Sequence, residues 1–253
     1  MSTIKEQFYF NFDGKESRQF NILAVDIGSN LYEEMLAPTR TVNQTQTSKG
    51  RIIFHSVQEE IRTFDLNLAF EEGFDEELID DISRWLFVDY YRPLYFEGQE
   101  DRVMFAMIVG DSSIIHNGLQ QGYFTVTIQT NSPYLFSRLK TNTKTITNTG
   151  TVPISNNGHL DVHPELSIEK VGDGDLTIGI DGRNVKIINL KNGESIYIDT
   201  LREIIETDIV ATYRYNNIVS GELEDLFVGY GNKEYKITGS CIFNYRFRER
   251  YRT

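Results

Sequence analysis

The sequence predicts a mainly β protein that divides near residue 136, and three patterns in its 253 residues support this prediction. Gly122–Phe136 begins with the two-residue alternation of a half-buried strand and stops at Pro133, which has no N–H to give a sheet. Short alternating segments separated by Gly, Asp and Asn follow, as in a β-sandwich. Only Gly73–Val88 has clear helical spacing. We therefore expect residues 1–136 to be β structure with one helix and residues 137–253 to be a β-sandwich.

The charge also changes at this boundary. The first 136 residues hold 10 Lys and Arg against 21 Asp and Glu, a net charge of −11, whereas the remainder holds 15 against 16, a net charge of −1. Tight binding to nucleic acid needs cations that replace counterions at phosphates, so sequence-specific nucleic-acid binding by the first unit is excluded. The simplest interpretation of the acidity is solubility. No run of 18 apolar residues predicts a membrane span, and the N-terminus lacks the apolar region of a signal peptide.

The first unit should begin with a β-hairpin. Gln7–Phe12 alternates, Asp13-Gly14 is a turn signal, and Gln19–Val25 is the expected return strand, with a loop lengthened by the residues between them. Further strands are expected at Arg51–Val57 and Ile61–Phe70, then in the segments 93–97, 102–109 and 122–130.

Ala37–Arg51 has almost no apolar side chains. Loops beyond about 12 residues are usually functional or disordered. The segment is either a solvated loop or an extended β-arm that becomes ordered against a partner, and its length favours the arm.

The helix is predicted from apolar residues at helical spacing between Leu78 and Leu86, with the single tryptophan, Trp85, on the apolar side. Asp75 is the expected N-cap. Glu76 and Glu77 then lie in the first turn, where carboxylates complement the helix dipole.

The second unit is predicted from six short alternating segments: 165–171, 176–180, 185–190, 195–198, 234–238 and 241–247. The Thr- and Asn-rich segment 137–159 is either a linker or an edge strand, and the sequence does not separate these alternatives.

No catalytic, cofactor-binding or metal-binding residue is predicted. The strongest metal candidate is His159, Asp161 and His163, which would share one face of a strand and suit zinc or iron, but Pro164 and the preceding Asn- and Gly-rich run favour a loop. Gly172–Asp175 lacks the spaced carboxylates of a calcium loop and is better explained as a turn. The single Cys241 cannot form an internal disulfide and is expected to be a small core residue.

The C-terminal segment alternates arginines with aromatic residues. Arg246, Arg248, Arg250 and Arg252 share one side. They would either dock on an acidic surface of this chain or a neighbour, or protect an edge strand from aggregation. Both interpretations stay open.

The order of these elements resembles a known family. A Phe-rich hairpin, the Trp85 helix and Gly122–Phe136 are followed by the sequences HPELSI at 163–168, GESIYID at 193–199 and GYGN at 229–232. This succession, over essentially the whole chain, is similar to the distal tail proteins (Dit) of siphophages that infect Gram-positive bacteria, of the Bacillus-phage type.

The resemblance implies a fold and an assembly. The expected fold is an N-terminal β-sandwich or split barrel with one α-helix, like that of tail-tube proteins, followed by an outward-facing galectin-like β-sandwich. The expected function is a structural hub, not an enzyme, at the distal end of a phage tail, assembled in the host cytoplasm. Homohexameric rings, which in the family can stack, would join the tail tube to the tail-tip (tail-associated lysin-like) protein and leave a channel for DNA. Tape-measure and receptor-binding proteins stay open as further partners; no cofactor and no membrane contact is implied.

The alternative is a carbohydrate-binding module that contacts the host cell wall. Tyr213 and Tyr215 share one face, but core or interface packing is the commoner use of such residues, and no sugar-site motif is present.

Overall fold

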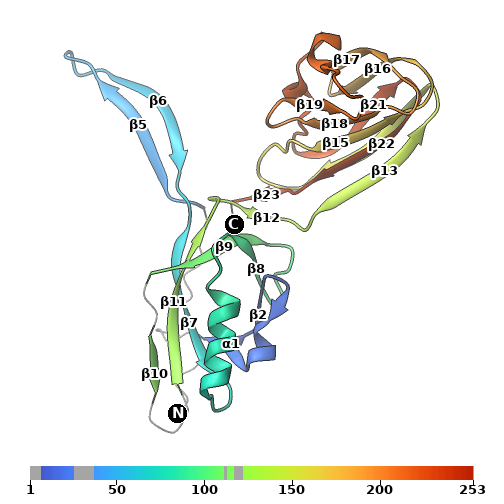
Figure 1. Ribbon diagram of the computed structural model, residues 1–253. Helices are drawn as coiled ribbons and strands as arrows, with labels where there is room; N and C mark the ends of the chain where they lie inside the picture. The colour runs from blue at the N-terminus through green and yellow to red at the C-terminus, as the bar shows by residue number, and fades with distance from the viewer. Residues whose placement is uncertain (1–6, 26–36, 111–112, 117–121, 253) are drawn as a thin grey trace. The chain divides into compact units, whose positions relative to one another are not determined.

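The computed structural model describes residues 7–25, 37–110, 113–116 and 122–252, as Figure 1 shows. The chain forms two compact units. The first comprises Met1–Phe136 with Arg252–Thr253, and the second comprises Ser137–Tyr251. Each unit has its own hydrophobic core.

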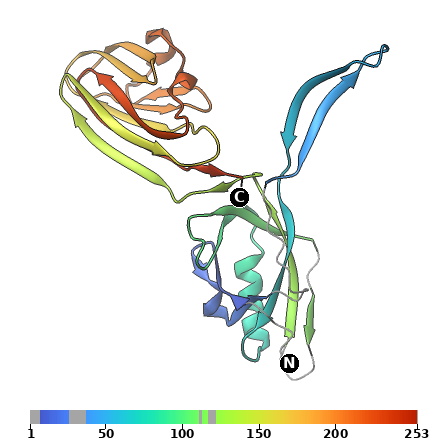
Figure 2. The same ribbon diagram turned by 180° about the vertical axis from the view of Figure 1, so that it is seen from behind.

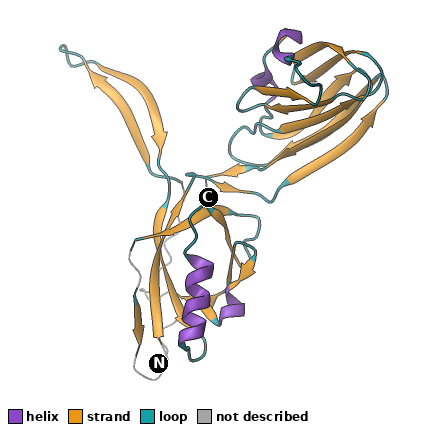
Figure 3. Cartoon of the chain, in the orientation of Figure 1, coloured by secondary structure: helices purple, strands orange, loops and turns teal. Residues whose placement is uncertain are grey.

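Nine antiparallel strands of the first unit form one sheet that curls around helix α1 (Glu76–Leu86), coloured purple in Figure 3. In spatial order they are β1 (Gln7–Phe8), β4 (Ile22–Val25), β7 (Thr63–Phe70), β11 (Gly122–Thr130), β9 (Met104–Val109), β8 (Arg92–Phe96), β2 (Phe10–Phe12) and β3 (Lys15–Glu16), with β10 (Ile114–His116) also paired to β11. The short β12 (Leu135–Phe136) follows. The unit is therefore a single curled sheet closed by a helix, as in a split barrel, and not two facing sheets.

The N-terminal turn is tighter than the sequence indicated. Lys15 and Glu16 pair with Phe12 and Asn11, so only Asp13 and Gly14 remain in the loop. Both have positive φ, 53° and 78°, which suits the two-residue hairpin turn that Asp-Gly favours. The expected return strand Gln19–Val25 begins instead with a 3₁₀ helix, η1 (Ser17–Phe20), and only Ile22–Val25 is extended.

Helix α1 begins at its predicted cap. The Leu78 amide donates to Asp75 Oδ1 at 2.9 Å. Trp85 is buried, stacks on Phe20 with ring centroids 4.3 Å apart, and donates its indole N–H to the Phe12 carbonyl oxygen at 2.8 Å. Because a buried indole N–H needs an acceptor, this bond fixes the helix against the β2 end of the sheet.

A separate two-stranded ribbon follows the β4 region in sequence. It consists of β5 (Arg40–Gln46) and β6 (Ile52–Glu59), and we call it the arm. The arm leads through Glu60–Arg62 into β7 and extends away from the nine-stranded sheet in both Figure 1 and Figure 2. Of the two alternatives for Ala37–Arg51, the structure has the extended β-arm, and its ordering against a partner stays a prediction.

The second unit is a sandwich of two five-stranded antiparallel sheets. One sheet has the order β13 (Lys140–Ile146), β22 (Cys241–Phe247), β15 (Glu165–Lys170), β18 (Ser195–Asp199), β19 (Ile204–Thr207). The other has the order β14 (Thr149–Asn156), β21 (Gly231–Thr238), β16 (Gly174–Ile180), β17 (Arg183–Leu190), β20 (Ile218–Ser220). Two 3₁₀ helices, η2 (Arg214–Asn217) and η3 (Leu223–Leu226), and the short β23 (Arg250–Tyr251) complete the unit.

The alternation in each sandwich strand sets its inward face. In β15, for example, Leu166, Ile168 and the stem of Lys170 are buried while Ser167 and Glu169 face solvent. The Thr- and Asn-rich segment 137–159 forms β13 and β14, each at the edge of its sheet, so the edge-strand alternative is correct. Across the described parts of both units, no helix has the length and apolarity that crossing a membrane requires.

Candidate assembly surface

The register of the arm places four of its apolar side chains on one side. Val42 pairs with Val57, Gln44 with Phe54 and Gln46 with Ile52, and alternate residues of a strand share a face. A β-bulge beyond Asn43 shifts the phase of β6, which brings Val57 to the same side as Phe54. Val42 is 51% exposed, Ile52 58%, Phe54 61% and Val57 41%. We call these four residues the apolar stripe.

The opposite side of the arm is polar and internally hydrogen-bonded. The Thr45 hydroxyl lies 2.8 Å from His55 Nε2, and the Asn43 amide donates to the Ser56 hydroxyl at 3.1 Å. Ile53 is the exposed aliphatic residue on this side. These cross-strand bonds fix which side of the ribbon is apolar, because a register slip by one residue would break them.

The base of the arm is held by a nearly buried carboxylate. Glu59 pairs with Arg40 at 3.0 Å and with Arg252 at 3.2 Å, and it accepts the Tyr134 hydroxyl. The hydrogen bond from Tyr134, with the two arginines, lowers the pKa of Glu59 below its usual value. Arg62, beside this site, donates to the Pro133 carbonyl oxygen at 3.0 Å. The arm is therefore fixed at its base while its apolar stripe is uncovered.

The arm differs in charge from the rest of the first unit. Residues 40–59 contain Arg40, Lys49 and Arg51 against one carboxylate, Glu59 at the base, a net charge of +2. The other residues of 1–136 then hold 7 cationic against 20 acidic side chains, a net charge of −13. The acidity noted from the sequence thus belongs to the body of the unit.

An apolar groove lies beside α1 on the body. It has a volume of about 180 Å³, and its lining includes Phe70, Ile79, Ile82, Phe87, Ile114 and Phe124. Ser83 and Ser113 are the polar residues of this lining, and no carboxylate of the described residues belongs to it. The groove is therefore mainly apolar.

The C-terminal arginines have partners within their own units. Arg246 pairs with Glu165, Arg248 donates to the Ser137 carbonyl oxygen at 2.8 Å, and Arg250 donates to the Asp161 carbonyl oxygen. Since β22 lies between β13 and β15, Arg246 does not protect an edge strand, whereas Arg250 lies on β23, which belongs to a separate two-stranded sheet. Carboxylates of the same chain pair with Arg246, through Glu165, and with Arg252, through Glu59, and docking on a neighbour stays a prediction.

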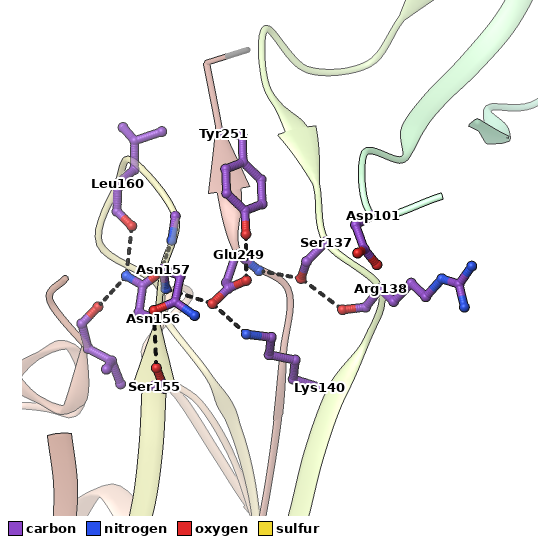
Figure 4. Close-up of polar contacts among 12 residues, drawn as sticks. Asp101, Ser137, Arg138, Lys140, Ser155, Asn156, Asn157, Leu160, Glu249 and Tyr251 are labelled. Carbon is purple, nitrogen blue, oxygen red and sulfur yellow. Dashed lines mark hydrogen bonds and ion pairs between the residues drawn. The ribbon is translucent and has the colours of Figure 1, made fainter. Parts of the chain in front are cut away.

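Figure 4 shows the polar cluster that holds the last strands of the sandwich. The Glu249 carboxylate is buried and accepts from the Asn157 amide at 2.6 Å, Lys140 Nζ at 2.5 Å and the Tyr251 hydroxyl at 2.6 Å. The Glu249 amide donates to the Ser137 hydroxyl at 2.9 Å. All four hydrogen bonds join residues of the second unit. The cluster therefore has a structural role, and we call it the clamp.

The residues of the metal candidate do not come together. The His159 ring packs on Tyr251 with centroids 5.5 Å apart, whereas His163 packs near Phe227 at 5.9 Å. Val162 between them forms an isolated bridge with Val228, so the segment is a loop, as Pro164 indicated. Within the described ranges, no group of three His, Cys, Asp or Glu side chains could hold a metal ion.

The single cysteine and the tyrosine pair singled out from the sequence pack as core or surface residues. Cys241 is fully buried in the sandwich, and burial raises the pKa of its thiol to about 11. Tyr215 packs against the core and its hydroxyl accepts the Ile205 amide at 3.2 Å, while Tyr213 lies exposed beside it.

Comparison with known proteins identifies the family. The phage tail protein N-terminal domain matches residues 5–132. The chain belongs to this phage tail protein family. YomH, an uncharacterized protein derived from the SPbeta prophage of Bacillus subtilis strain 168, is 28% identical over 254 residues, which cover 98% of this chain and 99% of YomH.

A solved structure with a TM-score above 0.5 shows the same fold. The crystal structure of SPP1 Dit aligns with a TM-score of 0.68 and 12% identity over 95% of this chain and 98% of that one. A chain of the phage P2 baseplate in its activated conformation aligns with a TM-score of 0.46 and 11% identity over 96% of this chain and 98% of that one. The resemblance to distal tail proteins is confirmed at the level of the fold, and with it the mainly β class with a single α-helix among the described residues. This tail protein is a structural component and not an enzyme.

Proposed function

We propose that this tail protein is the distal hub of a siphophage tail. In this proposal a homohexameric ring at the tip joins the tail tube to the tail-tip protein and leaves a central channel for DNA. The observation that carries it is the whole-chain likeness to SPP1 Dit, a protein described as a paradigm of hub adsorption apparatus in phages that infect Gram-positive bacteria. The likeness covers 95% of this chain and so spans both units, the curled sheet and the sandwich that follows it.

The two units take different roles in the hub. Residues 1–136 form the ring, because this unit carries the arm, whose apolar stripe needs a partner. Residues 137–253 form a galectin-like sandwich that faces outward. The net charge of −13 on the body of the first unit suits a channel wall that DNA passes without adhering, because phosphates repel carboxylates.

The ring is tested by measuring the mass and shape of the purified full chain. Light scattering should give a species of about six times the 29.2 kDa protomer, and electron micrographs should show rings. Protein that stays monomeric at all concentrations and salt conditions would contradict the proposal. Rings that bind neither purified tail tube nor tail-tip protein would leave assembly intact and contradict the hub role.

A second candidate function rests on an open groove of about 540 Å³ on the outward face of the sheet β13-β22-β15-β18-β19. Ser167 and Asn244 lie at neighbouring positions of its floor, and Tyr197 and Glu206 line its side. An aromatic ring beside hydroxyl, amide and carboxylate groups is the combination that sugars bind. Pull-down of the full chain by purified host cell wall, lost in Tyr197→Ala, would support saccharide binding, and equal recovery of both proteins would exclude this groove.

A further inference from the structure

We propose that the arm of one copy inserts its apolar stripe into the α1 groove of a neighbouring copy. This inference rests on the proposed ring and names the residues that close it. An isolated two-stranded ribbon is marginally stable in water, and burial of one apolar face is what makes such a ribbon persist. The stripe of Val42, Ile52, Phe54 and Val57 has no cover within the described part of its own chain, since each is more than 40% exposed.

The occupant is a second copy because charge and chemistry match. The arm carries +2 and the body −13, so an arm is attracted to the body of another copy. The groove offers aromatic and aliphatic side chains to the stripe. Phe54 is the most exposed phenylalanine of the described residues and fits the groove as its central anchor.

The groove of the same chain is out of reach. The arm joins the sheet at Thr63, the first residue of β7, whereas Phe70 of the groove is the last residue of that strand. These two residues are about 23 Å apart at 3.3 Å per residue, and Phe54 lies about 16 Å further along β6 from Glu59. Since the arm extends away from the sheet in both views, insertion within one chain would need the rigid base at Glu59 to break (Figures 1 and 2).

The contact is heterologous, because the arm and the groove are different surfaces of one protein. Such contacts propagate from copy to copy, and they close into a ring when the rotation between neighbours divides a full turn. Every copy then donates one arm and receives one, which leaves no apolar stripe exposed in a complete ring.

Cysteine pairs test the contact in the full chain. Phe54→Cys and Ser83→Cys place thiols on the arm and at the groove, and both positions are exposed. Oxidation of the double variant should give a ladder of covalent oligomers, while an equimolar mixture of the two single variants should stop at dimers. Cys241, the single cysteine of the parent protein, is buried and its thiol pKa is raised. The parent protein should therefore form no cross-link and serves as the negative control.

A matched pair of serine variants separates the two sides of the arm. Phe54→Ser should raise the concentration at which half the protein assembles at least tenfold. Ile53→Ser, on the polar side of the same strand, should change it less than twofold. Rings that form in the parent without a cross-linked ladder, or that persist in Phe54→Ser, would overturn the docking contact and leave the hub intact. A parent protein that never forms rings would contradict the hub itself.

Discussion

The sandwich and the arm differ in whether their side chains find partners within the chain. In the sandwich even charged groups find partners inside the unit: Arg214 makes a bidentate pair with Glu194 at 2.6 and 2.7 Å, and neither side chain is more than 6% exposed. In the arm, by contrast, four apolar side chains lie on one side with no cover within the described chain. A unit whose charged groups are paired internally can fold alone, whereas a ribbon with an uncovered apolar side needs a partner.

This difference predicts that substitutions in the sandwich change folding, and substitutions in the arm change assembly. The chain carries a separate probe for each unit, because its single tryptophan, Trp85, lies in the first and its single cysteine, Cys241, is buried in the second. Tryptophan fluorescence and thiol labelling therefore report unfolding of the two units independently.

The largest effect is expected for Arg214→Ala. This change leaves the Glu194 carboxylate buried without its cation, which typically costs about 3–5 kcal/mol. Thiol labelling of Cys241 in denaturant should shift accordingly, while the Trp85 transition stays in place. Arg202→Ala is the control, because Arg202 is largely exposed and its pair with Asp199 is long at 3.8 Å. Equal shifts in both variants would show that the buried pair has no special role.

A smaller loss is expected for Glu249→Ala, which removes the acceptor of three hydrogen bonds in the clamp of Figure 4. One hydrogen bond to a charged group contributes about 1.5–3 kcal/mol. Lys140 and Asn157 are exposed enough to donate to water once the carboxylate is removed, so the sandwich should lose about as much stability as one such bond provides. Burial alone would raise the pKa of Glu249, but its three donors hold the pKa below the usual value. The stabilisation is therefore full above the unfolded pKa and is lost as pH falls through the folded one. A Cys241 transition with the same pH dependence in Glu249→Ala as in the parent would contradict this.

Local sequence patterns predicted most strands and the helix because those elements bury one face against their own unit. The alternation of Gly122–Thr130 and the Asp75 cap are such signals. The apolar stripe was not predictable in this way, since three of its four residues lie in β6 and the bulge shifts Val57 out of simple alternation. Nor did alternation show that β22 is central, because strand order depends on contacts between residues far apart in sequence.

The base of the arm should respond modestly to acid. The pKa of Glu59 is lowered chiefly by the Tyr134 hydrogen bond, so the contact is present above the unfolded pKa of about 4.3 and is lost as pH falls through the folded pKa. The protection of the β5 and β6 amides against hydrogen exchange, taken relative to the intrinsic exchange rate at the same pH, should therefore fall at low pH. In Glu59→Gln the exchange should be faster at neutral pH already and respond less to acid. Glu97→Gln, which alters an exposed pair with Arg18, is the control and should leave the arm unchanged. Arm exchange that is insensitive to both acid and Glu59→Gln would show that this carboxylate does not hold the base.

The smallest effect on folding is expected where the effect on assembly is greatest. Phe54→Ser removes an exposed side chain from a free protomer, so the unfolding transitions of both units should move by less than about 0.5 kcal/mol in dilute, monomeric protein. Loss of the apolar surface should also reduce non-specific aggregation of unassembled protein. Fluorescence of Trp85 and labelling of Cys241 measure the first expectation, with Leu68→Ala in the buried core of the first unit as a positive control for a change of about 2–5 kcal/mol. A substantial loss of stability in Phe54→Ser would mean that the stripe is already covered in the monomer. The sandwich, with its internally paired groups, and the arm, with its uncovered apolar side, would then no longer differ as described.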